Sequence, residues 1–294
     1  MKLLLAITII LFSLSLSARV NLRVLGVASI LIEDENTKVL FDAPFTRPGL
    51  FHWLGIQKFK SNRGLVESVI KNHKLKKLDG VFISHSHFDH SVDAPMMAHL
   101  TGATLFADSN LKRMASAYKD INPKVTNAKN GEMIQVGHFK ITPIEIQHEK
   151  ILGIEFLPGN VPNNFDFDFY DYRVGNTWMY LVEHPAGIIM IAEAEQAHLK
   201  DFQAFRADIK KVDVLIQGIS RNNKKELLDG YLTIFSPKTF IPTHFDNFFI
   251  SYDHLEFHHY PWSRFYRTMD WIKIKAPSTK VIMPRLGQVI PILK

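Results

Sequence analysis

The segment FISHSHFDHS at residues 82–91 places three histidines and one aspartate directly after an apolar run. The preceding LDGVFI has the pattern of a short buried strand, so the polar residues begin where the chain leaves a sheet. His85 and His87 alternate and can therefore point to the same side of an extended segment. Asp89 and His90 can address a second point nearby. Imidazole and carboxylate groups are ligands of zinc and similar divalent ions, so four such donors in six positions predict a metal site.

The composition restricts such a site to histidine and carboxylate ligands. None of the 294 residues is cysteine, which excludes disulfides and thiolate-bound metals. No Gly-x-Ser-x-Gly sequence provides a serine nucleophile. An apolar fraction of 46% with 22% charged residues is typical of a globular protein with a sizeable core.

Residues 1–17 have the features of a secretory signal peptide. Lys2 supplies the positive charge, and an apolar run follows it. Ser15 and Ser17 satisfy the small-residue rule before a cleavage site. The run is shorter than the roughly 20 residues that a membrane-spanning helix needs, which favours cleavage over the alternative, an uncleaved anchor. The sequence therefore predicts an exported protein, periplasmic or extracellular, with one domain at residues 18–294. Membrane association is expected only through the N-terminus.

The positive charge of the chain does not predict a nucleic-acid partner. The formal net charge is +6, but the basic residues occur in short, interrupted clusters such as KLKK at 74–77 and RNNKK at 221–225. Such clusters are typical of solvated helix faces and loops. No nucleic-acid-binding module is present in the sequence, so no nucleic-acid partner is expected.

The order of strand-like and helix-like segments predicts a mixed α/β protein. Residues 63–76 have helical spacing, residues 131–148 form two strands, and residues 176–194 form a hairpin. Residues 280–292 are expected to form a closing pair of strands. No linker rich in Pro, Gly and Ser divides the chain, so two mixed sheets covered by helices in one domain are expected.

The pattern His-x-His-x-Asp-His after an apolar strand resembles the signature of the metallo-β-lactamase superfamily. Three further landmarks occur in the order of that family: LGVASILIEDENTKVLFDAPF with Asp42, ITPIEIQH with His148, and FIPTHFDNF with His244. They extend over nearly all of the chain after residue 17. The resemblance implies an α/β (α+β) fold, the four-layer αββα sandwich of two mixed β-sheets, with a metal centre at one edge of both sheets.

The resemblance also assigns roles to these residues. It implies a pair of Zn²⁺ ions, with other divalent ions as alternatives. Asp42 would support the metal-binding loop from below, and Asp89 would be both a ligand and a catalytic residue. The implied ligands of the first ion are His85, His87 and His148, and those of the second ion are Asp89, His90 and His244.

The sequence departs from the family at the residue that usually bridges both ions. Family members have an Asp there, at the end of a strand closing in Gly-Asp, whereas GIIMIAEAEQ at residues 187–196 places Glu193 at this position. The arm of Glu193 is one methylene longer, so it could bridge after a small shift or bind one ion only. Glu195 is a second candidate. Whether one or two ions bind is therefore open at this point.

The resemblance implies hydrolysis by a metal-bound hydroxide, because a divalent ion lowers the pKa of its water towards about 7. Ester, lactone and phosphodiester bonds are the implied targets. The sequences LFDAPFTRPG and HFDNFF are most similar to the branch with N-acylphosphatidylethanolamine phospholipases and ascorbate-phosphate lactonases, which implies a small-molecule or lipid-like substrate. The alternative is a non-catalytic metal- or ligand-binding protein on the same fold, in which Glu193 marks a loss of catalysis.

Residues 151–172 follow His148 and are rich in aromatic side chains. Phe165, Phe167 and Phe169 alternate with polar residues, as on a strand with one apolar face. They could form a lid over the metals that receives an apolar substrate group, or they could pack into the core. The sequence favours neither interpretation.

Overall fold

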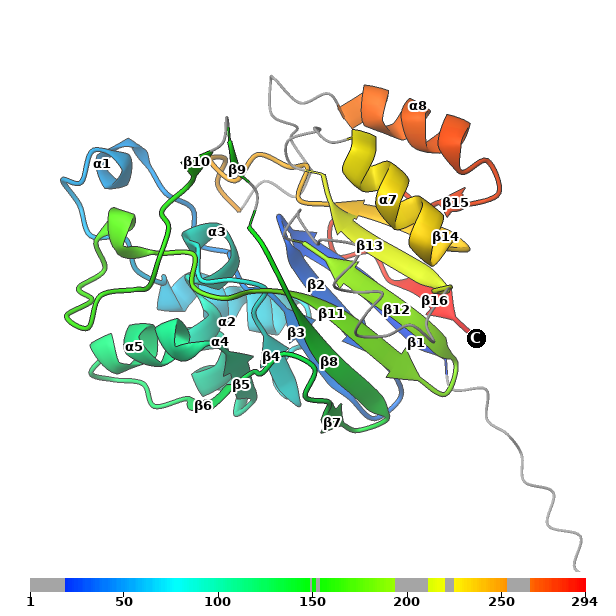
Figure 1. The fold of residues 1–294 in the computed structure, drawn as a ribbon. Coiled ribbons are helices and arrows are strands. Elements are labelled where there is room, and N and C mark those ends of the chain that lie inside the picture. Colours follow the sequence, from blue (N-terminus) through cyan, green and yellow to red (C-terminus); the bar gives the residue numbers. More distant parts are fainter. Residues whose placement is uncertain (1–18, 149, 152–153, 194–210, 220–224, 253–264) are drawn as a thin grey trace, which may run out of the picture.

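The computed structural model describes residues 19–148, 150–151, 154–193, 211–219, 225–252 and 265–294 (Figure 1). The predicted signal segment at residues 1–17 and the alternative ligand Glu195 lie outside these ranges. Two seven-stranded sheets face each other, and helices cover the outer face of each sheet (Figure 1). Within the described ranges, no helix has the length and apolar character needed to cross a membrane.

The first sheet combines an antiparallel meander with parallel strands, in the order β16-β1-β2-β3-β4-β5-β6. β1, β2 and β3 are antiparallel neighbours, whereas β3 to β6 run parallel. The meander strands are covered on both faces, which explains why their sequences are nearly continuous apolar runs. The strands of this sheet are β1 (Val20–Gly26), β2 (Ser29–Glu33), β3 (Lys38–Phe41), β4 (Gly80–Phe82), β5 (Thr104–Ala107), β6 (Lys124–Asn127) and β16 (Ile290–Leu293).

The second sheet has the order β15-β14-β13-β12-β11-β8-β7. It is antiparallel from β7 to β12 and parallel from β12 to β15. A short hairpin of β9 and β10 follows β8. The strands are β7 (Ile134–Val136), β8 (Phe139–Ile146), β9 (Lys150–Ile151), β10 (Ile154–Glu155), β11 (Thr177–His184), β12 (Gly187–Ala192), β13 (Val214–Gly218), β14 (Thr239–Thr243) and β15 (Lys280–Val281).

Helices form the two outer layers of the sandwich (Figure 1). α2, α4 and α5 lie against the first sheet, and α7 and α8 lie against the second. Side chains of Asn62 and Asp108 cap the starts of α2 and α5 by accepting backbone N–H groups. The helices are α1 (Leu50–Trp53), α2 (Arg63–Asn72), α3 (Phe88–Ser91), α4 (Ala94–Thr101), α5 (Ser109–Ala117), the 3₁₀ helix η1 (Phe169–Asp171), α7 (Lys225–Phe235) and α8 (Phe265–Lys275).

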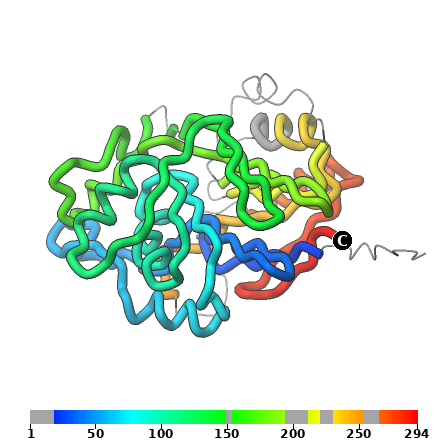
Figure 2. The backbone as a smooth tube through the Cα atoms, turned by 90° about the horizontal axis from the view of Figure 1, so that it is seen from below, coloured from blue at the N-terminus to red at the C-terminus, as the bar shows by residue number. Residues whose placement is uncertain are grey.

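Three hydrophobic clusters fill the spaces between the four layers. One lies between the first sheet and its helices, one between the two sheets, and one between the second sheet and α7 and α8. The central cluster joins residues of both sheets, among them Val24, Ile32, Tyr180 and Ile216. This layering confirms the predicted αββα sandwich, and the view from below shows the C-terminal segment beside the N-terminal strands of the first sheet (Figure 2).

The carboxyl ends of five strands meet at one edge of the sandwich. β3 and β4 are parallel in the first sheet, and β8, β12 and β14 share one direction in the second. Loops that leave the carboxyl ends of parallel strands are the usual place of ligand sites in such folds. The predicted site residues follow these strands as Asp42 after β3, His85 after β4, His148 after β8, Glu193 after β12 and His244 after β14.

Residues 280–292 do not form the expected strand pair. β15 pairs with β14 of the second sheet, whereas β16 pairs with β1 of the first. An alternating apolar pattern identifies a strand but not its partner, because the partner is selected by the rest of the sheet. The C-terminal segment therefore crosses between the sheets and closes the outer edge of each of them.

Phe165, Phe167 and Phe169 pack into the core and form no strand. Phe165 and Phe169 are buried, and Phe167 is half-buried against the same cluster. The φ angle of Phe167 is 59°, which interrupts an extended segment. The ring of Phe169 lies 4.6 Å from that of Phe88, centroid to centroid. These contacts favour the core interpretation over a lid.

Phe169→Ala should lower the free energy of unfolding by about 3–5 kcal/mol, because it leaves a cavity in a well-packed aromatic cluster. The matched control is Phe51→Ala in α1, where the side chain is 58% exposed and the expected loss is below about 0.5 kcal/mol. Denaturant unfolding of both variants measures the difference. Equal losses in the two variants would contradict the packing described here.

Candidate metal centre

The four donors of the motif lie on a loop at residues 83–92, named the metal loop here, which begins after β4 and contains α3. Backbone hydrogen bonds join this loop to neighbouring segments, and a serine side chain binds carbonyls within the loop. Ser86 N donates to Val174 O at 3.0 Å, and Ser91 Oγ donates to the carbonyls of Ser86 and His87 at 2.9 and 2.8 Å. The positions of the four donors are therefore set by the loop before any ion binds.

His85, His87 and His148 come together as a first set of donors. Nε2 of His85 lies 3.0 Å from Nδ1 of His87. The ring of His148 lies 4.7 Å from that of His85 and 4.6 Å from that of His87. One ligand atom from each residue falls within a common group whose members are within 4.8 Å of one another.

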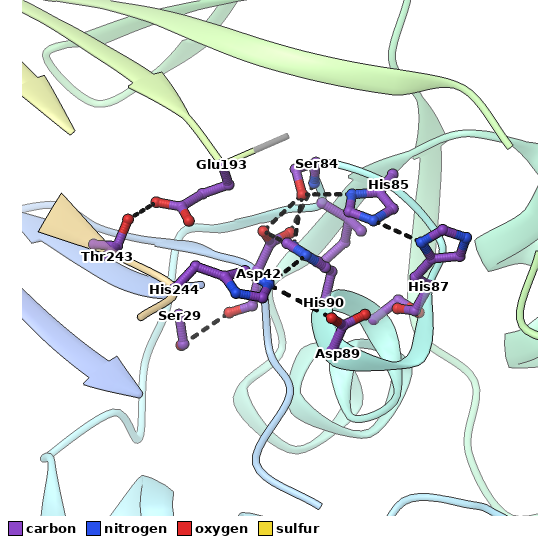
Figure 3. Close-up of polar contacts among 12 residues, drawn as sticks. Ser29, Asp42, Ser84, His85, His87, Asp89, His90, Glu193, Thr243 and His244 are labelled. Carbon is purple, nitrogen blue, oxygen red and sulfur yellow. Dashed lines mark hydrogen bonds and ion pairs between the residues drawn. The ribbon is translucent and has the colours of Figure 1, made fainter. Parts of the chain in front are cut away.

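Asp89, His90 and His244 come together as a second set (Figure 3). Nε2 of His90 and Nε2 of His244 are 3.1 Å apart, and Oδ2 of Asp89 lies 3.5 Å from Nε2 of His244. His244 follows β14 with a φ of 52°, a left-handed conformation that is held by its N–H bond to Val27 O. Backbone strain of this kind is concentrated at functional sites.

Both sets have the dimensions of a divalent metal site. Zinc binds imidazole nitrogen at about 2.0–2.1 Å in tetrahedral geometry, which separates two ligand nitrogens by about 3.4 Å. The facing nitrogens are 3.0 Å apart in the first set and 3.1 Å apart in the second. Imidazole and carboxylate donors without thiolate suit Zn²⁺ and similar ions. The residues present therefore fit a centre for divalent metal, in which Asp89 and His90 also lie close to His85.

Hydrogen bonds hold the second ring nitrogens of His87 and His90, which do not face the ion positions. Nε2 of His87 donates to Phe156 O at 2.9 Å, which leaves Nδ1 to face His85. Nδ1 of His90 contacts Oδ2 of Asp42 at 2.8 Å, which directs Nε2 towards the second set. Metal-binding histidines commonly donate their other N–H to a carbonyl or carboxylate in this way.

Asp42 contacts the metal loop through Ser84 and His90. Its carboxylate is buried and accepts hydrogen bonds from Ser84 N and Ser84 Oγ, both at 2.7 Å. Its backbone carbonyl accepts from Ser29 Oγ at 2.9 Å, and its φ is 54°. Ser84 was not singled out in the sequence, because a serine beside a ligand has no distinguishing spacing. Its hydroxyl also lies 3.2 Å from Nδ1 of His85 and so joins both sets.

The environment keeps the imidazoles of His85 and His87 neutral. Burial, followed by the neighbouring histidines, holds the pKa of His85 well below its usual value. Burial and then His148 lower the pKa of His87 to about 3. Metal binding requires unprotonated imidazole, so these two side chains are in the ligand form at neutral pH.

In the second set, the pKa of His244 is shifted in the opposite direction to those of His85 and His87. Burial disfavours the protonated form of His244, but the hydrogen bond and charge of Asp89 outweigh burial and raise the pKa of His244. Burial also disfavours the charged form of Asp89, but contacts with His244 and His90 outweigh it and lower the pKa of Asp89. Asp89 therefore favours the protonated form of His244, and protons compete with an ion for this side chain.

Glu193 is buried at the end of β12, on the side of the second set (Figure 3). Burial raises the pKa of Glu193 to about 8, against the opposing hydrogen bond from Thr243. In the described part of the chain, Glu193 makes no hydrogen bond to a residue of either set. Whether it bridges two ions stays a prediction. Thr243 was not recognised in the sequence, although it directly precedes His244.

Another group of donors, Asp34, His138 and His184, lies at the opposite edge of the sandwich. Oδ2 of Asp34 is 2.9 Å from Nδ1 of His138 and 3.4 Å from Nε2 of His184. Ala186 N donates to Nδ1 of His184 at 3.1 Å, so a neutral His184 carries its proton on Nε2 and faces Asp34 with it. This arrangement is a hydrogen-bonded network and does not favour a metal at His184.

The sandwich, with donors at the carboxyl ends of its strands, defines the metallo-β-lactamase fold. Residues 37–177 match the family model of the β-lactamase superfamily domain. The match and the fold together confirm the resemblance to the metallo-β-lactamase superfamily that the metal-loop motif indicated.

Relatives of the chain include a protein named as a metal-dependent hydrolase in Anaeromyxobacter dehalogenans. It is 26% identical over 183 residues, which cover 60% of this chain and 61% of the relative, so the chain spans about three fifths of that protein. Igni18, a metallo hydrolase of the archaeon Ignicoccus hospitalis, has a TM-score of 0.60 and 17% identity, covering 92% of this chain and 97% of the other. An isothiocyanate hydrolase from Delia radicum gut bacteria has a TM-score of 0.61 and 14% identity, with coverages of 93% and 100%. The two structures show a shared fold.

Lowering the pH should release the ion of the second set before that of the first. Protons compete with the ion for His244 at higher pH because its pKa is raised, and for His85 and His87 only at lower pH because theirs are lowered. Zinc content after equilibration between about pH 7 and pH 4 should pass through a plateau near one ion per chain. His244→Ala should abolish the step at higher pH. Release of both ions in a single step would contradict the assignment.

Proposed function

We propose that the chain is a metal-dependent hydrolase with two divalent ions, most suitably Zn²⁺. The observation that carries the proposal is the presence of two adjacent donor sets, each with a pair of facing imidazole nitrogens at 3.0 or 3.1 Å. The rings of His85 and His90, one from each set, are 3.9 Å apart, so the two ion positions adjoin. The printed name of the relative from Anaeromyxobacter dehalogenans supports the same reaction class.

The residues of the chain have separate tasks in this proposal. Bound divalent ions would supply Lewis acidity and lower the pKa of a water molecule. Asp89 would be a ligand of the second ion and would orient the attacking water; it is partly accessible, with 15% of its side chain exposed. Asp42 holds His90, and the Phe156 carbonyl holds His87. The preorganised loop means that little rearrangement is needed when charge develops on the substrate.

The proposed substrate is an ester, lactone or phosphodiester with an apolar group next to the scissile bond. Aromatic rings border both donor sets. The ring of Phe156 lies 5.7 Å from His87, and that of Phe248 lies 6.3 Å from His244. Phe249, which is 39% exposed, lies 4.5 Å from Phe248, measured between ring centroids. These rings, rather than the buried Phe169, would contact an acyl or aryl group.

Asp89→Ala should lower kcat/KM by about 10²–10⁴-fold, because it removes a ligand and the group that orients water. Asp166→Ala is the matched control, since that carboxylate is 77% exposed and pairs with Lys58. Turnover of a panel of esters, lactones and phosphodiesters by the zinc-loaded protein tests both variants. A chelator should abolish turnover, and zinc should restore it. A fully loaded wild-type protein without any turnover would instead favour the non-catalytic binding protein.

We also propose that the protein is exported and that residues 1–17 are removed. The support comes from Lys2, the short apolar run and the spacing of Ser15 and Ser17. Intact-mass measurement of the protein recovered outside the cytoplasm should show a chain that begins near residue 18. Recovery of an intact chain with Met1, attached to membranes, would show an anchor in place of a cleaved signal.

A further inference from the structure

Three adjacent parallel strands bring Glu193 together with Gly218 and Thr243. The family resemblance gives these two residues no role in the site. The register pairs Ala192 of β12 with Gln217 of β13, and Gly218 of β13 with Thr243 of β14. Glu193 follows Ala192 directly, so it lies beside Gly218 and Thr243 at the same edge of the sheet. This edge carries the metal centre (Figure 3).

Thr243 occupies one oxygen of the Glu193 carboxylate. The side chain of Thr243 is fully buried, and its Oγ1 donates a short hydrogen bond to Oε1 of Glu193. The other oxygen, Oε2, is shielded from solvent and has no hydrogen-bond partner in the described part of the chain. A buried carboxylate oxygen without a partner is costly and requires an explanation. A bound cation supplies one.

Gly218 leaves the space that the longer arm of Glu193 needs. A Cβ at Gly218 would lie 2.7 Å from the backbone oxygen of Glu193 and 3.3 Å from its Oε2. Both contacts are tighter than ordinary van der Waals contact, and the first is to rigid backbone. Any larger residue at this position would therefore push Glu193 out of its place.

Glu193 lies on the side of the cluster where the second donor set is found. It approaches from the side of Asp42, His90 and His244, whereas His85 and His87 lie on the far side of the cluster (Figure 3). With Oε1 held by Thr243, Oε2 is the oxygen of Glu193 that has no hydrogen-bond partner in the described residues, and Glu193 lies on the side of the second set (Figure 3).

We infer that Thr243 is a positioning residue of the metal centre: its hydroxyl holds Oε1 of Glu193, so that Oε2 is offered to the ion of Asp89, His90 and His244. This inference rests on the proposed two-ion site and specifies it further. Gly218 and Thr243 together compensate for the additional methylene of Glu193 relative to the Asp that is usual in the family.

The test compares zinc retention by full-length variants. Thr243→Val removes the hydroxyl at nearly constant volume, Thr243→Ser keeps it, and Thr142→Val controls for the same exchange at another buried threonine of the sheet. Zinc-loaded proteins are mixed with a chromogenic chelator, and the release of each ion is followed over time. The phase that His244→Ala lacks identifies the ion of the second set.

Thr243→Val should weaken retention of the second-set ion about 10–100-fold, the usual effect of removing a group that orients a ligand, and leave the other ion unchanged. Thr243→Ser and Thr142→Val should behave as the wild type. Gly218→Ala should weaken the same ion. Thermal unfolding of the metal-free variants separates this effect from misfolding, because each variant should still unfold in one cooperative transition above the temperature of the release measurement.

Two results would overturn the inference. Equal weakening of both ions by Thr243→Val would show that Glu193 bridges them, and unchanged retention would show that Thr243 does not position Glu193. A wild-type protein that retains no zinc would refute the proposed function itself. This outcome is distinguishable from the two results above, in which the wild-type protein does retain zinc. The readout is metal release, so it does not depend on finding the substrate.

Discussion

The buried carboxylate of Asp42 connects the first sheet to the metal centre. It receives two hydrogen bonds from Ser84 and one contact from His90, so a charge that would be costly in the core is compensated by donors that lie on the metal loop. The left-handed backbone of Asp42, with a φ of 54°, costs about 1–3 kcal/mol and persists because the surroundings determine it. Without this carboxylate, the orientation of His90 and the start of the metal loop would lose their common support.

The ligands proposed for each ion come from separate segments of the chain. The metal loop supplies donors to both sets, and the second sheet completes each of them from the end of a separate strand: His148 after β8 and His244 after β14. Neither half of the sandwich contains a complete set. The metal centre therefore depends on the packing of the central cluster, which places the two sheet edges opposite each other.

The parts that the sequence predicted are local in the chain, and those that it did not predict are contacts between distant residues. The donors of the metal loop share one short motif, and β11 and β12 share one hairpin, so patterns within a few residues were sufficient. The partners of β15 and β16 were not predictable, since pairing depends on sheets assembled from elsewhere. The bond from Thr243 to Glu193 joins residues 50 positions apart, and nothing in either local sequence indicates it.

The hydrogen bond from His87 to the carbonyl of Phe156 has a thermodynamic consequence. Phe156 follows the β9–β10 hairpin, and its ring borders the first donor set, so the same residue orients a ligand and lines the approach to it. A substrate that displaces this segment would change the affinity of the first ion, and linkage then requires that occupancy by the ion change the affinity for the substrate by the same factor. The effect of the substrate on metal affinity and the effect of the metal on substrate affinity would then have the same coupling free energy.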